Sequence, residues 1–444
     1  MRILLFIAIL FAGADLAAQL FIRPAPAEGY EQRIRSYVDS LQIVDTHEHL
    51  SDPERIRKSN KADFMLLLQQ YADDDIKSAG LSKPAFERLL GDSLTIPEKW
   101  EILQPWWEKS SNTAYNRAVM VTMDHLFGIG ELNGETVGPL SEKIRNAYQT
   151  DWHNHILREK CRIRYVINDN PDRSFGDPGL FRYTQRFDYF RLDSREKVEE
   201  VTRRTAIAIS HPEDLAEALK AEFETAMHAG FVTLKTTAAY QRTLFFDDVS
   251  REEAAASLES ILKSGGQTVS AAQAKPLADY MMHRLLDLAQ QYDKPVQIHT
   301  GLQAGDGNYI ENANPTHLAN LFLKYREVRF VLLHGGYPFG SELASLAKNF
   351  RNVYIDLAWL YIISPSFSER YLHEWLETVP ANKIMGFGGD YDNVENVYAH
   401  QLFARQIIGN VLVQKVKDRY LSEKEAMKIA SMLLYQNAVD FYRL

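Results

Sequence analysis

Short apolar runs that alternate with longer helical patterns are the feature that most constrains the fold of this chain. The runs are rich in aliphatic and β-branched residues and are bounded by Gly, Pro or charged residues, which is typical of buried strands. Strands that alternate with helices indicate βαβ units and a parallel sheet. The predicted strands are residues 42–46, 163–167, 189–192, 231–234, 296–298, 328–333, 352–357 and 383–387.

This number of strands predicts an α/β chain with a closed (β/α)8 TIM barrel. An open doubly wound sheet is the alternative, but no Gly-rich phosphate loop follows the first strand. We expect the barrel over residues 41–444, after a linker and an N-terminal helix at residues 19–40. Within it, a helix is predicted near residues 276–292, because Pro276 suits a first helical turn.

Residues 51–150 lack the regular alternation of strands and helices. They are rich in Trp, Leu, Lys and Glu, and apolar residues recur at helical spacing, as in residues 64–68. The segment therefore predicts a helical insertion after the first strand. Its position in the chain would let it act as a lid over a site at that end of the barrel.

The N-terminus has the pattern of a secretory signal peptide. Arg2 is followed by an apolar run at residues 3–11 and by small residues, so cleavage after Ala14 or Ala18 is expected and residues 1–18 are assigned to the signal. The run is too short to span a bilayer comfortably. We expect a periplasmic or secreted protein without a stable membrane anchor.

Composition excludes some classes of partner. The formal net charge is -9 and there is no basic cluster, which argues against a nucleic-acid partner. Cys161 is the only cysteine, so no intrachain disulfide forms, and its place at the start of a predicted strand indicates a structural role. A small-molecule substrate is expected, and the oligomeric state, including a homo-oligomer, stays open.

Polar residues that can bind a metal or move a proton close or follow several of the predicted strands. The carboxyl ends of barrel strands share one face, where catalytic groups collect, so these residues are predicted to form one site. The six are His47, His49, Lys235, His299, His334 and Asp390.

His47 and His49 are two residues apart at a strand end, so both side chains point to the same face and form half of a zinc site. His299 is the predicted third ligand, and Asp390 is predicted both to bind the metal and to take a proton from a metal-activated water. His334 could bind a second metal or polarise a substrate carbonyl. Zn²⁺ fits this ligand set best, and Mn²⁺, Fe²⁺ or Co²⁺ could substitute.

Four further residues are predicted to contact the substrate. Lys235, Tyr240 and Arg242 follow the fourth strand and could hold a carboxylate, for which arginine has the right bidentate geometry. A surface loop is the alternative interpretation of Tyr240 and Arg242. Trp359, after the seventh strand, would line the pocket or only pack in the core.

The ordered set of six residues resembles the amidohydrolase superfamily. Residues 298–301, 333–338 and 388–390 are similar to its amidohydrolase-related branch, and residues 435–438 resemble the closing helix of that branch. The branch holds metal-dependent hydrolases, decarboxylases, lactonases and relatives of uronate isomerase, and the long insertion is similar to that of uronate isomerases.

The resemblance implies one divalent metal on His47, His49, His299 and Asp390, with His334 either supporting the metal ligands from behind or polarising the substrate. Lys235 lies where binuclear members keep a bridging carboxylated lysine, so one metal or two are both open. The expected function is hydrolysis of an amide, lactone or related carbonyl compound that carries a carboxylate. The alternatives are decarboxylation, isomerisation of a uronate, or a catalytically silent binding barrel.

Overall fold

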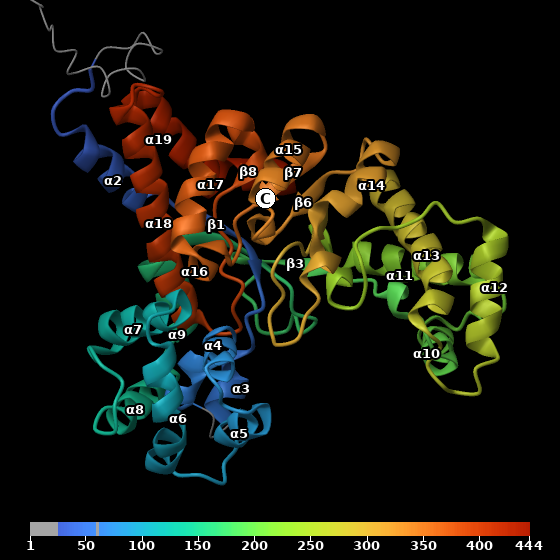
Figure 1. Ribbon diagram of the computed structural model, residues 1–444, viewed down its shortest axis with the longest axis horizontal. Helices are drawn as coiled ribbons and strands as arrows, with labels where there is room; N and C mark the ends of the chain where they lie inside the picture. The colour runs from blue at the N-terminus through green and yellow to red at the C-terminus, as the bar shows by residue number, and fades with distance from the viewer. Residues whose placement is uncertain (1–24, 59–61) are drawn as a thin grey trace, which may run out of the picture.

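The computed structural model describes residues 25–58 and 62–444 (Figure 1). The predicted signal peptide at residues 1–18 lies outside these described residues. No helix in the described ranges combines the length and the apolar character that crossing a bilayer requires.

Eight parallel strands form a single sheet in the order of the chain, β1 to β8, and confirm the predicted (β/α)8 barrel. The barrel closes between β1 and the residues that directly follow β8, through backbone hydrogen bonds from the Thr46 N–H to the Phe387 carbonyl (3.1 Å) and from the Asp390 N–H to the His47 carbonyl (2.9 Å). The strands are β1 (Ile43–Glu48), β2 (Ile163–Asn168), β3 (Phe181–Gln185), β4 (Thr233–Thr236), β5 (Val296–Ile298), β6 (Phe330–Leu332), β7 (Val353–Asp356) and β8 (Ile384–Met385).

The third strand differs from the prediction. Residues 189–192 were predicted as a strand, but Tyr189–Arg191 is a 3-10 turn, η3, and the strand lies earlier, at Phe181–Gln185. Tyr189 and Phe190 are buried by packing under helices rather than by sheet pairing. In β3, Arg182 interrupts the apolar pattern, and its guanidinium covers the ring of Tyr165 on the neighbouring strand (4.9 Å).

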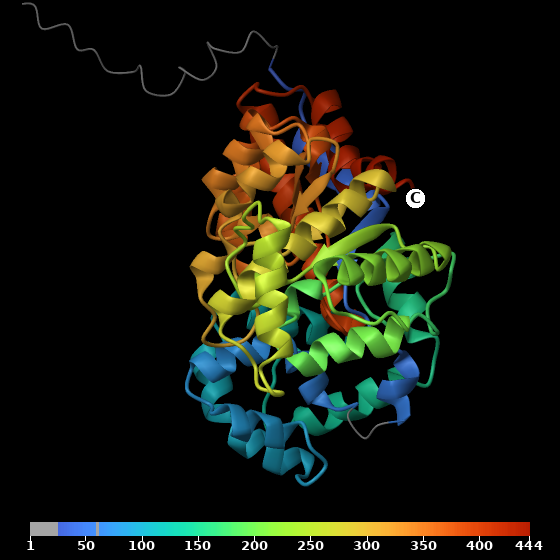
Figure 2. The same ribbon diagram turned by 90° about the vertical axis from the view of Figure 1, so that its right-hand side faces the viewer.

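Helices surround the barrel (Figures 1 and 2). Several begin with a reciprocal cap, as in α13, where Ser270 and Gln273 satisfy each other's backbone N–H groups. This cap starts α13 before the predicted residue 276, and the helix continues through Pro276. The helices outside the β1–β2 segment are α2 (Tyr30–Ser40), α10 (Arg195–Thr205), α11 (Pro212–His228), α12 (Arg251–Leu262), α13 (Ala271–Gln291), α14 (Ala319–Lys324), α15 (Gly340–Asn349), α16 (Leu360–Ile363), α17 (Pro365–Thr378), α18 (Val394–Lys417), α19 (Glu423–Ser431) and α20 (Asn437–Tyr442).

The described residues between β1 and β2 form a series of helices joined by loops and gather at one end of the molecule, in blue to teal in both views (Figures 1 and 2). Its elements are α3 (Pro53–Lys58), η1 (Phe64–Leu68), α4 (Ala72–Ser78), α5 (Lys83–Leu89), α6 (Ile96–Ser110), α7 (Ala114–Phe127), α8 (Val137–Ala147), α9 (Trp152–Asn154) and η2 (His155–Lys160). The remaining short turns of the barrel are η4 (Ala238–Tyr240), η5 (Ile310–Ala313), η6 (Pro315–Leu318), η7 (His334–Gly336), η8 (Ala381–Lys383) and η9 (Met432–Gln436).

Candidate metal centre

Three of the predicted ligands converge where β1 and β8 meet. Nε2 of His47 lies 3.3 Å from Oδ1 of Asp390, and Nε2 of His49 lies 3.2 Å from the same oxygen. One ligand atom from each of the three residues falls within 4.8 Å of the others. Two imidazoles and a carboxylate at this separation are a donor set suited to a divalent cation.

Backbone strain accompanies the site. Asp390 has φ 63°, and His334 and Trp359 each have φ 65°, a left-handed conformation that is uncommon for residues other than glycine. Asp390 is held there by its N–H bond to the His47 carbonyl and by the Tyr71 hydroxyl, which donates to the Asp390 carbonyl (2.6 Å). The fold therefore fixes the direction of the Asp390 side chain.

A glycine permits the close approach behind Asp390. A Cβ atom on Gly389 would lie 1.8 Å from Oε1 of Glu48, so only glycine fits beside that buried carboxyl group. The Glu48 carboxyl group accepts the Tyr391 N–H (2.7 Å).

The contact with Lys235 indicates which tautomer His47 adopts. Its ammonium lies 2.9 Å from Nε2 of His47 and can only donate, so Nε2 presents a lone pair and the ring proton is on Nδ1. Burial lowers the pKa of Lys235 to about 8. The Nε2 lone pair of His47 therefore accepts a hydrogen bond from the Lys235 ammonium and also faces the Asp390 carboxyl group. A lone pair in this position is suited to bind a metal ion.

His299 lies beside the three-residue cluster rather than in it. Its Nε2 contacts the Leu302 carbonyl (2.8 Å), and Nδ1 of His334 contacts the Ala358 carbonyl (3.1 Å), so both of these nitrogens carry protons. The remaining nitrogens, Nδ1 of His299 and Nε2 of His334, face each other at 2.9 Å. Two nitrogen lone pairs that face each other repel unless a proton or another cation lies between them. Burial lowers the pKa of both imidazoles, which disfavours the proton.

Other buried carboxyl groups under the site favour their neutral form. Burial raises the pKa of Asp45 and of Asp356 to about 7. Burial and the neighbouring Asp45 also raise the pKa of Glu48 well above its usual range. These groups therefore compete weakly with Asp390 for a cation.

A cavity of about 310 Å³, here called the inner chamber, opens onto the centre. Lys235 and Tyr240 line it, as predicted, and the Tyr240 ring lies 4.7 Å from that of His299. The residues lining the inner chamber are His47, His49, Gln70, Tyr71, Arg186, Arg191, Lys235, Thr237, Tyr240, Gln241, His299, Ala304 and Asp390.

Two of the residues predicted to contact the substrate, Arg242 and Trp359, do not line the inner chamber. Arg242 does not line the inner chamber, because its guanidinium forms an ion pair with the buried Asp279 (2.6 Å) and bonds to the Phe245 carbonyl. Trp359 is buried behind the chamber wall, stacked on Tyr71 at 4.3 Å with its ring edge toward His334. Trp359 therefore supports the chamber wall from behind, whereas Arg242 holds its own loop against α13.

Two arginines that were not predicted from the sequence, Arg186 and Arg191, line the inner chamber. Arg186 directly follows β3, and Arg191 ends the η3 turn and donates to the Thr237 hydroxyl (3.1 Å). Correct placement of β3 at Phe181–Gln185 would have identified Arg186, because it would then follow a strand end as the other site residues do.

The helical segment after β1 also reaches the site. Gln70 and Tyr71 line the inner chamber, and Asp74 of α4 accepts the Gly305 N–H (2.8 Å) from the loop after β5. These contacts put the segment against the chamber, although closure as a lid stays a prediction.

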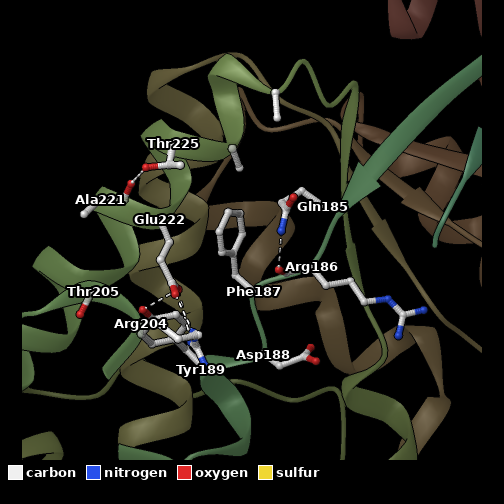
Figure 3. A pocket seen from close by; sticks show the side chains of 12 residues that line it. Gln185, Arg186, Phe187, Asp188, Tyr189, Arg204, Thr205, Ala221, Glu222 and Thr225 are labelled. Carbon is white, nitrogen blue, oxygen red and sulfur yellow. Dashed lines mark hydrogen bonds and ion pairs between the residues drawn. The ribbon is translucent and has the colours of Figure 1, made fainter. Parts of the chain in front are cut away.

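Another cavity, of about 650 Å³, lies between α10, α11 and the segment after β3 (Figure 3). One of its carboxylates, Glu222, is bonded to Arg204 (2.8 Å) and Tyr189 (2.8 Å), and the Arg186 side chain points away from Glu222 in Figure 3. It holds none of the predicted metal ligands.

Comparisons with known proteins agree with this architecture. Protein fluG of Emericella nidulans is 32% identical over 199 residues, which are 42% of this chain and 23% of that protein. A uronate isomerase of Rhizorhabdus wittichii is 29% identical over 106 residues, which are 24% of this chain and 23% of that protein. The matches thus cover less than a quarter of either curated relative.

The crystal structure of a uronate isomerase from Thermotoga maritima has a similar fold, with a TM-score of 0.76, 18% identity, and coverage of 98% of this chain and 100% of that one. The family model described as Amidohydrolase matches residues 150–444, a segment that includes His299, His334 and Asp390. The chain therefore belongs to the amidohydrolase family of metal-dependent (β/α)8-barrel enzymes.

Proposed function

We propose that the protein is a metal-dependent hydrolase that cleaves an amide, lactone or related carbonyl compound carrying a carboxylate. The observation that carries this proposal is the convergence of His47, His49 and Asp390 on the inner chamber, whose wall also bears cationic side chains. A carboxylate-bearing substrate would meet those cations while its carbonyl group faced the metal centre.

His47, His49 and Asp390 would hold the metal, and His299 would complete the set through Nδ1, the nitrogen that faces His334. Three imidazoles and one carboxylate favour Zn²⁺, with Mn²⁺, Fe²⁺ or Co²⁺ as substitutes. When bound, such a cation supplies Lewis acidity and lowers the pKa of water.

The side chains of the chain itself would carry the proton transfers. Asp390 would accept a proton from the attacking water and return it to the leaving group. His334 does not line the inner chamber. Its Nδ1 lies 3.6 Å from Oδ2 of Asp390 and its Nε2 faces His299, so it would act by orienting these two residues toward the substrate carbonyl. Asp390 is thus the proposed catalytic residue, and His334 is its positioning partner.

Arg191 is the proposed anchor for the substrate carboxylate. Its Nε has no hydrogen-bond partner among the described residues, and the nearest carboxylate, on Asp188, is 3.8 Å away. Arg186, by contrast, is engaged by Asp169 through two bonds from Nε, of 3.0 and 2.9 Å. Lys235 and Tyr240 would complete the polar wall around the anchored group.

Isomerisation of a uronate is the second candidate, and the relatives named uronate isomerase favour it. It would use the same metal site and carboxylate anchor. The two reactions differ in the mass of their products, because hydrolysis of an amide or a lactone adds one water, whereas isomerisation leaves the mass unchanged.

The test is product analysis after reconstitution with Zn²⁺, using carboxylate-bearing amides and lactones in parallel with D-glucuronate. We expect products whose total mass exceeds that of the substrate by one water, as two fragments from an open-chain amide or as one hydroxy acid from a lactone, and no product from an Asp390→Asn control. A ketose from D-glucuronate alone would favour the isomerase, and released CO₂ would favour a decarboxylase. Wild-type protein that retains no metal after reconstitution would exclude both metal-dependent candidates and leave the silent binding barrel.

A further inference from the structure

A second cavity, here called the outer chamber, adjoins the inner chamber. It has a volume of about 470 Å³ and shares His49 and Arg186 with the inner chamber, so these two side chains form the boundary between them. The outer chamber is lined by His49, Asp169, Asn170, Pro171, Arg173, Thr184, Gln185, Arg186 and Asp188. A molecule seated at the metal centre could therefore extend past His49.

Most charges of the outer chamber already have partners. Asp169 is buried and pairs with Arg186, and it also accepts the Thr184 hydroxyl (2.6 Å). Asp188 faces Arg191 of the inner chamber at 3.8 Å, so its charge helps to orient the proposed carboxylate anchor. Neither acid lies within ion-pair distance of the remaining cation among the described residues.

That remaining cation is Arg173. Its Nη2 donates to the Thr184 carbonyl (3.0 Å) and to the Gln185 side-chain oxygen (2.8 Å), and its guanidinium lies 5.2 Å from the centre of the Tyr183 ring. These partners are neutral, and no carboxylate pairs with Arg173 in residues 25–58 or 62–444. Burial lowers the pKa of the guanidinium, because no counter-charge replaces the lost hydration.

We propose that Arg173 binds a carboxylate on the fragment that leaves during hydrolysis. The substrate class would then be an amide with acidic groups on both sides of the scissile bond, one held by Arg191 in the inner chamber and one by Arg173 in the outer chamber. An arginine with one edge bonded to neutral oxygens keeps N–H groups for a planar carboxylate.

This inference rests on the proposed hydrolysis and assigns its two products to the two chambers. One water is consumed: a C–O bond forms at the carbonyl carbon, the C–N bond breaks, and the leaving nitrogen takes the proton. The acyl fragment remains in the inner chamber, and the amine fragment, with its carboxylate, remains in the outer chamber.

The experiment compares two ligands that differ at the outer carboxylate alone. N-succinylglycine has a carboxylate on each side of its amide, and N-succinylglycinamide replaces the outer one by a neutral amide. We expect calorimetry on the Zn²⁺-loaded wild type to show about tenfold tighter binding of the diacid. Arg173→Gln should bind both ligands equally, and Arg173→Lys should restore part of the preference.

Arg182→Gln is the matched control, because Arg182 also bonds to backbone carbonyls but lines neither chamber. It should keep the wild-type preference. Equal affinity of the wild type for both ligands, no binding of either, or a preference that survives in Arg173→Gln would overturn the proposal. Turnover is measured separately: cleavage without the preference overturns the subsite alone, and the preference without cleavage overturns the hydrolysis alone.

Discussion

Asp390 meets two demands at once. It must adopt φ 63°, and it must direct a carboxylate at His47 and His49. Asparagine tolerates the left-handed conformation about as well as aspartate does, and it has nearly the same shape. Replacement by asparagine therefore separates the charge of the residue from its backbone role.

We predict that Asp390→Asn folds normally but binds Zn²⁺ at least about a hundredfold more weakly, because an anionic ligand is lost. Metal content after dialysis, and competition with a chelating dye, would measure the change. Asp356→Asn is the control: that carboxyl group is also buried at a strand end, accepts the Ala358 N–H (2.8 Å) and favours its neutral form. Unchanged affinity in Asp390→Asn would remove this residue from the metal site.

At the scale of single residues, the sequence predicted those side chains that directly follow a recognisable strand. His47, His49 and Asp390 converge because parallel strands end on one face of the barrel. Arg242 lies away from the inner chamber because a loop after a strand can turn either way, and this one turns its guanidinium toward Asp279. The pairing of His299 with His334 could not be read from the sequence, since it depends on sub-ångström ring placement.

Among the elements, the helices after β1 are fastened to the barrel through the first turn of α18. Glu395 is fully buried there and accepts hydrogen bonds from the Trp152 indole (2.9 Å) and the Tyr148 hydroxyl (3.2 Å). Its backbone carbonyl accepts the Thr122 hydroxyl (3.2 Å). Burial raises the pKa of Glu395 from 4.5 to about 7.

We predict that this carboxyl group makes the stability of the protein depend on pH. The folded state keeps the proton where the unfolded state has lost it, so stability falls as pH rises from 4.5 to about 7 and is constant above that. The loss through Glu395 is about 3 kcal/mol. Glu395→Gln should lack this component, and urea unfolding of both proteins across the range would measure it.

Other buried carboxyl groups titrate in both proteins, so the difference between the two curves isolates Glu395. Parallel curves for the wild type and Glu395→Gln would contradict the prediction. A difference that grows above pH 7 instead would assign the effect to another group.

At the level of elements, the barrel was predictable because seven of its strands are apolar runs followed by helices. The exception, β3, carries Arg182 and Gln185, and its burial alternates imperfectly, so the aromatic run at residues 189–192 gave the stronger local pattern. Tertiary packing overrode that local preference, since Tyr189 and Phe190 are buried as a turn.

The barrel as a whole closes at the metal centre. We call the junction of residues 43–51 with residues 386–392 the seam of the barrel. Its backbone hydrogen bonds include those from the His49 N–H to the Tyr391 carbonyl (3.0 Å) and from the Ser51 N–H to the Asp392 carbonyl (3.1 Å). β8 has two residues and pairs with β7. His47 and His49 lie on one side of the seam and Asp390 on the other, so a cation bound to all three would join the ends of the sheet.

We therefore predict that metal binding stabilises the seam before any other part of the barrel. Zn²⁺ at 100 times its dissociation constant should raise the free energy of unfolding by about 2.7 kcal/mol. Hydrogen exchange, with and without a chelator, should slow chiefly in residues 43–51 and 386–392, and Asp390→Asn should abolish the difference. Protection spread evenly over the eight strands would mean that the cation stabilises the fold without closing the seam, and the metal would then have to be placed away from the junction of β1 and β8.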